Sequence, residues 1–134
     1  MSKYEISRMT GGVIVALIGV AVALGGFQLR NGAPPSWPDV IAADTTVKSA
    51  AKGMVAVGVL LFTAGAAATL GIGWGYAAAT SATAAFVLGA FWANYVLFGD
   101  IRLIHTGPNV LVGMLVVWLL WVGYSLSKSS GASL

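Results

Sequence analysis

The chain has no cysteine and a single histidine, His105, and these shortages exclude several kinds of chemistry. Without cysteine, one chain forms no disulfide, thiolate nucleophile, cysteine-ligated zinc site or iron–sulfur cluster. With one histidine and four acidic residues, a metal site would need ligands from several chains, and a bis-histidine haem within one chain is impossible. The sequence therefore predicts no metal site and no catalytic residues, and it favours a protein that is not an enzyme.

Charge is also scarce, since Asp, Glu, Lys and Arg make up 8% of the residues, where about 25% is usual for soluble domains. The seven Lys and Arg residues give a net charge of +3, yet they stand singly rather than in a basic patch. Single basic residues at helix ends are typical of contacts with lipid headgroups. We therefore expect the lipid bilayer as a partner and no nucleic acid.

Apolar residues dominate what remains, at 58% of the chain, with a mean hydropathy of +0.89. Stretches without Asp, Glu, Lys, Arg or His cover Gly11–Phe27, Gly53–Leu70, Ala77–Phe98 and Asn109–Leu126. Each is long enough to cross a bilayer core of about 30 Å as a helix, which satisfies its own backbone hydrogen bonds in lipid. We predict an all-α integral membrane protein, a four-transmembrane-helix bundle forming a single domain over 1–134. The spans are expected at about 10–28, 53–70, 77–98 and 109–126.

The connection from Gln28 to Lys52 has two parts of different character. Its first part contains Pro34 and Pro35, which disfavour a helix, so we expect an extended or turned surface stretch there. From Asp39 to Lys52, the pattern predicts a short interfacial helix, with Trp37 as an anchor in the headgroup zone. A lid over a substrate is the alternative interpretation.

Small residues recur every three or four positions in the first and third apolar stretches. They are Gly12, Ala16, Gly19, Ala23 and Gly26 in the first, and Ala77, Ser81, Ala85, Gly89 and Ala93 in the third. Such strips let helix backbones approach closely in lipid, where no hydrophobic force drives helices together. We therefore predict that the first and third helices form the most intimate pair, and that Gly89→Leu disrupts their packing.

Polar side chains gather where the third apolar stretch ends and the fourth begins. We identify as a candidate site for the polar head of a quinone or lipid the residues Tyr95, Asp100, Arg102, His105 and Asn109. His105 and Tyr95 can donate hydrogen bonds, while Asp100 can orient His105 or relay a proton. The competing interpretation is a structural turn in which Asp100 and Arg102 form an ion pair. Asn94, beside this cluster, is expected to hydrogen-bond across helices.

Three functions are compatible with these features. The favoured hypothesis is a non-catalytic subunit that assembles with a larger membrane complex, such as a respiratory or other redox complex, or with copies of itself. The second is a stand-alone quinone- or lipid-binding protein, which requires a cavity beside the polar cluster. The third is an oligomeric channel or transporter, which is weakened because no apolar stretch carries a charge.

Basic residues and helix order predict the setting of the chain in the membrane. Lys3 and Arg8 precede the first span and Arg30 follows it, so we expect both termini in the cytoplasm of a bacterium, with the chain in its inner membrane. Met1–Phe27 is interpreted as a span rather than a cleaved signal. Four short helices with a polar turn between the last two resemble the plan of DoxX-like membrane proteins, a likeness of architecture that assigns no site residue.

Overall fold

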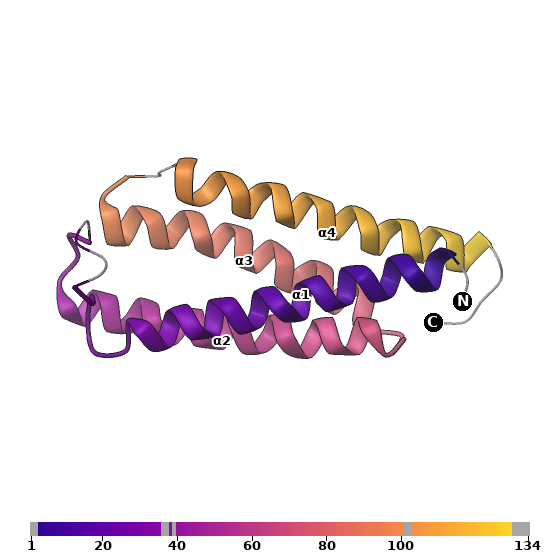
Figure 1. Cartoon of the computed structure of the whole chain (residues 1–134), viewed down its shortest axis with the longest axis horizontal. Coiled ribbons are helices and arrows are strands. Elements are labelled where there is room, and N and C mark those ends of the chain that lie inside the picture. Colours follow the sequence, from indigo (N-terminus) through magenta and orange to yellow (C-terminus); the bar gives the residue numbers. More distant parts are fainter. Residues whose placement is uncertain (1–2, 36–37, 39, 101–102, 130–134) are drawn as a thin grey trace.

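The structure is a computed structural model and contains four long helices. It describes the backbone of residues 3–35, 38, 40–100 and 103–129, and the side chains of residues 5–35, 38, 40–100 and 106–122. The helices are α1 (Lys3–Gln28), α2 (Asp44–Thr69), α3 (Gly75–Phe98) and α4 (Leu103–Ser129) (Figure 1). The described residues form no strand. The fold therefore confirms the predicted all-α, four-helix class.

Helix length and composition support the predicted membrane character. Three helices are long and apolar enough to cross a membrane, at Glu5–Gln28, Asp44–Thr69 and Gly75–Phe98. A shorter apolar helical stretch, Thr106–Val122, lies in α4. Large apolar side chains such as Leu17, Leu60 and Leu88 are exposed on the outside of the bundle, which suits a lipid environment. The protein is thus a membrane-associated helical bundle.

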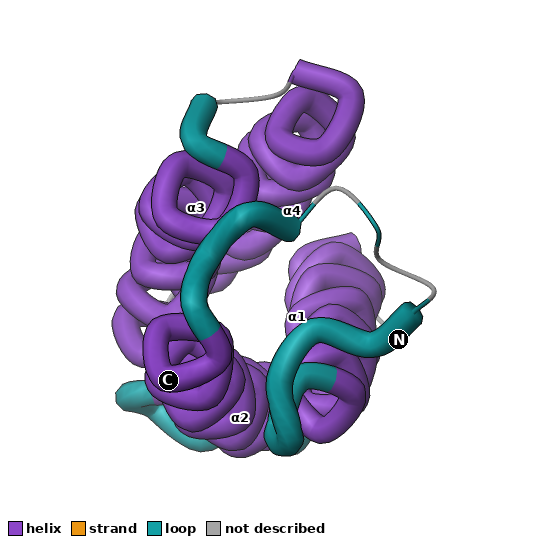
Figure 2. Tube along the Cα trace, turned by 90° about the vertical axis from the view of Figure 1, so that its left-hand side faces the viewer, coloured by secondary structure: helices purple, strands orange, loops and turns teal. Residues whose placement is uncertain are grey.

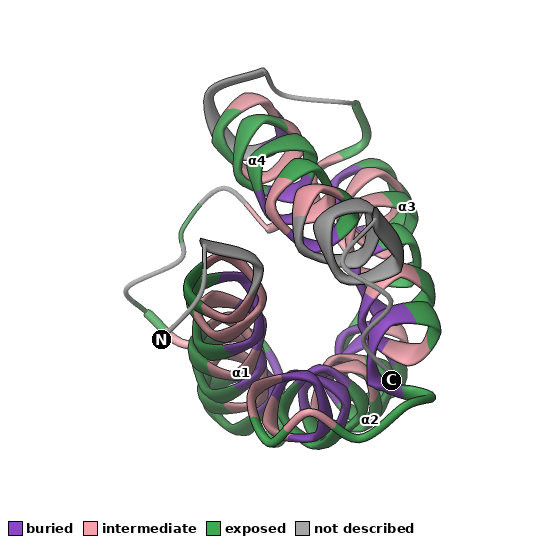
Figure 3. Cartoon of the chain, turned by 90° about the vertical axis from the view of Figure 1, so that its right-hand side faces the viewer, coloured by how far each residue is buried: buried purple, intermediate pink, exposed green. Residues whose placement is uncertain are grey.

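The helices form a ring in which each one packs against its neighbours in the chain, and α4 closes the ring against α1 (Figure 2). Buried residues face the inside of this ring and exposed residues face outward (Figure 3). Because α1 and α3 stand diagonally, they share very little contact. The prediction that the first and third helices form the most intimate pair is therefore wrong.

The intimate pair is instead α1 and α2, which meet along a seam of small residues. The residues that face each other across this seam are Gly12 with Gly65, Gly19 with Gly58, and Gly26 with Ala51. A Cβ atom added to Gly19 would lie 2.5 Å from the backbone nitrogen of Phe62 and 2.6 Å from the carbonyl oxygen of Gly58. The two backbones thus touch directly, a geometry that also brings Cα–H groups toward carbonyl oxygens.

The predicted ridge on the third helix has no such role. Ala77, Ser81 and Ala85 are exposed, and a Cβ atom at Gly89 would meet nothing within 4 Å. Gly89 therefore does not lie in a close helix contact, which was the reason to expect that Gly89→Leu disrupts packing. In α2, the small residues of the seam are seven positions apart, at residues 51, 58 and 65. Those of α1 have the same spacing, at residues 12, 19 and 26. Two antiparallel helices with the same seven-residue period keep their small residues opposite one another along their whole contact.

The predicted interfacial helix is not a separate element among the described residues. Its helical part, from Asp44 onward, forms the first turns of α2. No proline or glycine interrupts the chain between Asp44 and Lys52, so the helix continues directly into the apolar span. Val47 in these turns is fully buried, which ties them to the bundle rather than to the membrane surface.

Two clusters of buried side chains hold the bundle together. The turn-end core, next to the α2–α3 turn, contains Val15, Leu61, Ala64, Ala68, Tyr76, Ala79, Ala82, Val116 and Leu120. The loop-end core, under the connection between α1 and α2, contains Leu29, Val47, Ala50, Ala51 and Leu97. The two cores lie toward opposite ends of the bundle, so the space between them is framed by all four helices.

The α1–α2 connection forms a backbone hydrogen bond with the end of α3. The backbone N–H of Ile41 donates to the carbonyl of Leu97 at 2.9 Å. Gly99, which follows α3, has a φ of +80° and donates its N–H to the carbonyl of Tyr95 at 2.9 Å. This left-handed glycine ends the helix where the connection crosses it.

We expect Gly99→Ala to destabilise the protein by about 1 kcal/mol or more, because an L-residue in the left-handed region is strained. Its Cβ atom would also lie 2.8 Å from Cδ1 of Ile41. Thermal unfolding in detergent measures the effect. Gly53→Ala is the control, since nothing lies within 4 Å of a Cβ there and alanine stabilises a helix interior by about 0.5–1 kcal/mol. Equal shifts for both variants would contradict the expectation.

Candidate functional site

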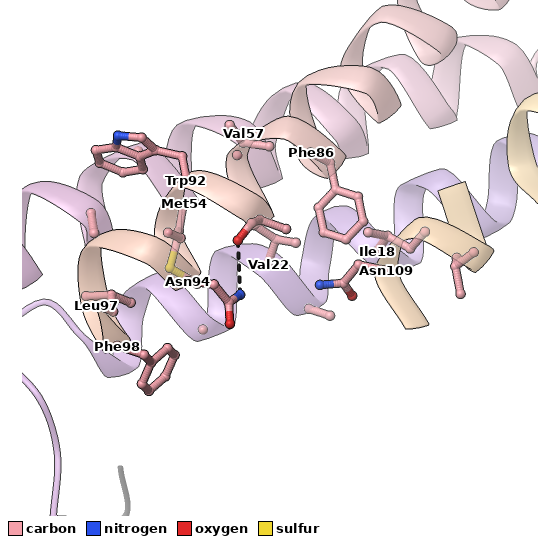
Figure 4. A pocket seen from close by; sticks show the side chains of 18 of the residues that line it. Ile18, Val22, Met54, Val57, Phe86, Trp92, Asn94, Leu97, Phe98 and Asn109 are labelled. Carbon is pink, nitrogen blue, oxygen red and sulfur yellow. Dashed lines mark hydrogen bonds between the residues drawn. The ribbon is translucent and has the colours of Figure 1, made fainter. Parts of the chain in front are cut away.

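A cavity of about 760 Å³ lies between the two cores, where all four helices contribute to its wall (Figure 4). The wall residues that come from α1 are Ile18, Ala21, Val22 and Gly25, and those from α2 are Ala50, Gly53, Met54 and Val57. Both sets follow the spacing of a single helix face. From α3 come Phe86, Gly89, Ala90, Trp92, Ala93, Asn94, Leu97 and Phe98, while α4 adds Asn109 and Val112, and the connection adds Pro38.

Small residues keep this space open. Gly53 and Gly89 both border the cavity, and a Cβ atom at either would meet nothing within 4 Å. Ala21 and Ala93 add little volume on the facing helices. Of the small residues of α3 that predicted a packing ridge, Gly89 and Ala93 therefore border a cavity instead of a helix contact.

Two carboxamides, Asn94 and Asn109, supply polarity to a wall that is otherwise mainly apolar. Asn94 is 7% exposed, and its Nδ2 donates to the carbonyl oxygen of Ala90 at 3.0 Å. Its Oδ1 is buried and accepts no hydrogen bond from the part of the chain that the structure describes. Buried polar atoms nearly always form a hydrogen bond, so we expect a hydrogen-bond donor at this oxygen.

The two carboxamides lie at different depths. With a rise of about 1.5 Å per residue along the helix axis, Asn94 lies ~6 Å before Phe98, the last residue of α3. Phe86 lies ~12 Å farther along the same axis than Asn94, toward the middle of the bundle. Asn109 is at the level of Phe86, farther from the loop end than Asn94 (Figure 4). A molecule that fills the cavity would therefore meet one polar group near the end of the spans and another near the middle of the bundle.

The predicted site residues are only partly brought together. Asn109 borders the cavity. Tyr95 is 63% exposed and Asp100 is exposed, and neither belongs to the cavity wall. Arg102 and the side chain of His105 lie outside the described residues. The candidate site is therefore the cavity itself, which shares Asn109 with the predicted cluster.

Asn94 was expected to hydrogen-bond across helices, and this is wrong for its amide nitrogen, which bonds within α3. Sequence reasoning also missed the wall residues of α1 and α2. Their spacing is a visible signal, but the same spacing is typical of a packed helix face, so it does not separate a cavity from a core.

The described lining residues include no acid, base or histidine, and the two carboxamides can both donate and accept hydrogen bonds. The volume of the cavity lies within the range of about 300–1,000 Å³ that is usual for small-molecule sites, which are mostly apolar with a few placed polar groups. Comparison with protein-family models, curated proteins and solved structures found no match to this chain.

Proposed function

We propose that this protein binds an amphiphilic small molecule, a lipid or a quinone, in the cavity between its four helices. The observation that carries the proposal is the cavity of about 760 Å³ with a buried oxygen on Asn94 that accepts no hydrogen bond from the described residues. A mainly apolar wall favours an aliphatic or isoprenoid body, and the carboxamides favour a molecule with polar groups.

The position of the cavity supports an orientation for this molecule. Asn94 lies near the loop end of α3, so the polar head would sit there, close to the membrane surface. The body would then extend past Gly89 toward Phe86 and the middle of the bundle, where Asn109 offers a second polar contact. The turn-end core, which includes the fully buried Val15, Leu61 and Val116, would stop it from passing farther. The same packed core would close a path through the centre of a single chain.

The subunit of a larger membrane complex is the second candidate function. The observation that favours it is a row of large, exposed apolar side chains on α4, which are Leu111, Met114, Leu115, Trp118 and Trp121. Aromatic residues and methionine are enriched at protein interfaces, so this face suits a partner helix as well as lipid. For the setting, we propose a bacterial inner membrane with both termini in the cytoplasm, on the basis of Lys3 and Arg8 before the first span.

Purification of the full chain from its native membrane in nanodiscs, followed by mass spectrometry of proteins and extracted small molecules, tests both candidates. We expect one amphiphile at a fixed ratio to the protein and above its abundance in the surrounding membrane. Extracted molecules that merely mirror the bulk lipid would contradict the binding function. A stoichiometric set of larger proteins would support the second candidate.

A further inference from the structure

We propose that the cavity selects an amphiphile whose head is a hydroxyl group, which donates its hydrogen bond to Oδ1 of Asn94. This inference rests on the proposed binding function and specifies the chemical class of the ligand. It follows from the hydrogen bonding of one side chain, Asn94, and from the groups that line the cavity around it.

The orientation of the Asn94 carboxamide is determined by its neighbour on the same helix. The carbonyl oxygen of Ala90, at 3.0 Å, only accepts hydrogen bonds, so the carboxamide must present its Nδ2 there. Its Oδ1 then faces elsewhere as an acceptor, and it receives no hydrogen bond from the described part of the chain. Turning the carboxamide over would bring two acceptors together and lose the bond to Ala90.

An acceptor that lacks a partner discriminates between head groups. Ketones, ethers and esters carry acceptors only, so they would leave Oδ1 of Asn94 unpaired. A hydroxyl group, as in a fatty alcohol, an acylglycerol, a sterol-like alcohol or a quinol, supplies the missing donor. Among quinones, the reduced form would therefore be preferred over the oxidised form.

Charged head groups fit the described wall less well. An ammonium group also donates, but burying its charge is costly without an acidic partner, and the described lining residues include no acid. The same lining includes no Lys or Arg, so a phosphate head lacks a cationic partner. A neutral hydroxyl group matches the wall without leaving a buried charge.

Asn94 is buried, and so is its Oδ1, so a neighbouring side chain must move before the hydroxyl group of a ligand can reach this oxygen. Met54 lines the same cavity and is half-buried, and an unbranched side chain with several rotatable bonds adapts readily to a neighbour. Asn109 can either donate or accept, so it places no such restriction on the group that it contacts.

A matched pair of probes tests this selection: 1-dodecanol, which has a hydroxyl head, and dodecyl methyl ether, whose oxygen only accepts. Equilibrium binding to the full chain in nanodiscs, corrected for partition of each probe into the bilayer, gives the two affinities. We expect the alcohol to bind about threefold to tenfold more tightly than the ether, the range for one net hydrogen bond. In Asn94→Leu, which removes the acceptor, this ratio should fall to about one.

Each outcome addresses a different statement. Saturable binding of both probes with equal affinity to the native chain would overturn the hydroxyl selection and leave the binding function standing. Saturable binding of neither probe would overturn the binding function as well. If Asn94→Leu fails to fold, the ratio measured on the native chain still decides. Ala85→Leu, at an exposed position of α3 outside the cavity wall, is the matched control and should keep the native ratio.

Discussion

Gly19→Val is expected to separate α1 from α2 and to destabilise the protein by about 3 kcal/mol, the upper end of the usual cost of overpacking. The cost is high because the added Cβ atom would meet backbone rather than flexible side chains. It would lie 2.5 Å from the nitrogen of Phe62 and 2.6 Å from the carbonyl oxygen of Gly58. Thermal unfolding of the purified protein in detergent measures the loss.

The reciprocal variant Gly58→Val should behave in the same way, since its Cβ atom would lie 2.6 Å from the carbonyl oxygen of Gly19. Gly53→Val is the matched control on α2, where a Cβ atom meets nothing within 4 Å. If the seam variants and this control unfold at the same temperature, the close approach of α1 and α2 is not what holds the bundle together.

Gly89→Trp is expected to abolish or greatly weaken ligand binding, by tenfold or more, while the bundle stays folded. Gly89 lies five residues before Asn94 on α3, or about 7.5 Å from it along the helix, on the path proposed for the body of the ligand. A large ring at this position would take up space in the cavity, which Gly89 borders, and its Cβ atom would meet nothing within 4 Å. Equilibrium binding of 1-dodecanol measures the loss.

Ala85→Trp provides the control for this variant, since Ala85 is on the same helix but is exposed and lies outside the cavity wall. It should bind the probe as the native chain does. Unchanged binding in Gly89→Trp would show that the ligand does not pass Gly89, whereas unfolding of Gly89→Trp alone would show that α3 packs there after all.

The variants at Gly19 and Gly89 test small residues in two different settings. Gly19 lies where two backbones touch, and Gly89 lies where they do not. Small residues in membrane helices permit close packing, but they permit an open space equally well. The helices α1 and α2 are closely packed, and the ring that they form with α3 and α4 leaves room for a cavity.

The sequence by itself determined that this chain forms four helices with membrane character. Hydropathy and helix length are local properties that add up along the chain, so stretches such as Gly53–Leu70 and Ala77–Phe98 predict helices wherever their neighbours lie. The start of α2 was harder to predict, because the turns from Asp44 to Lys52 are polar enough to suggest a surface helix. Burial of Val47 against the loop-end core joins them to the span.

Only the tertiary structure decided which helices are in contact and where a cavity separates them. Gly89 and Gly19 look alike as sequence, and their difference depends on what stands opposite each one across the bundle. The same holds for the site, in which Asn109 was predicted, whereas Met54 and Val57 were not. A cavity is a relation between the faces of several helices, so its residues carry the ordinary pattern of a packed core until the helices are placed around the ring.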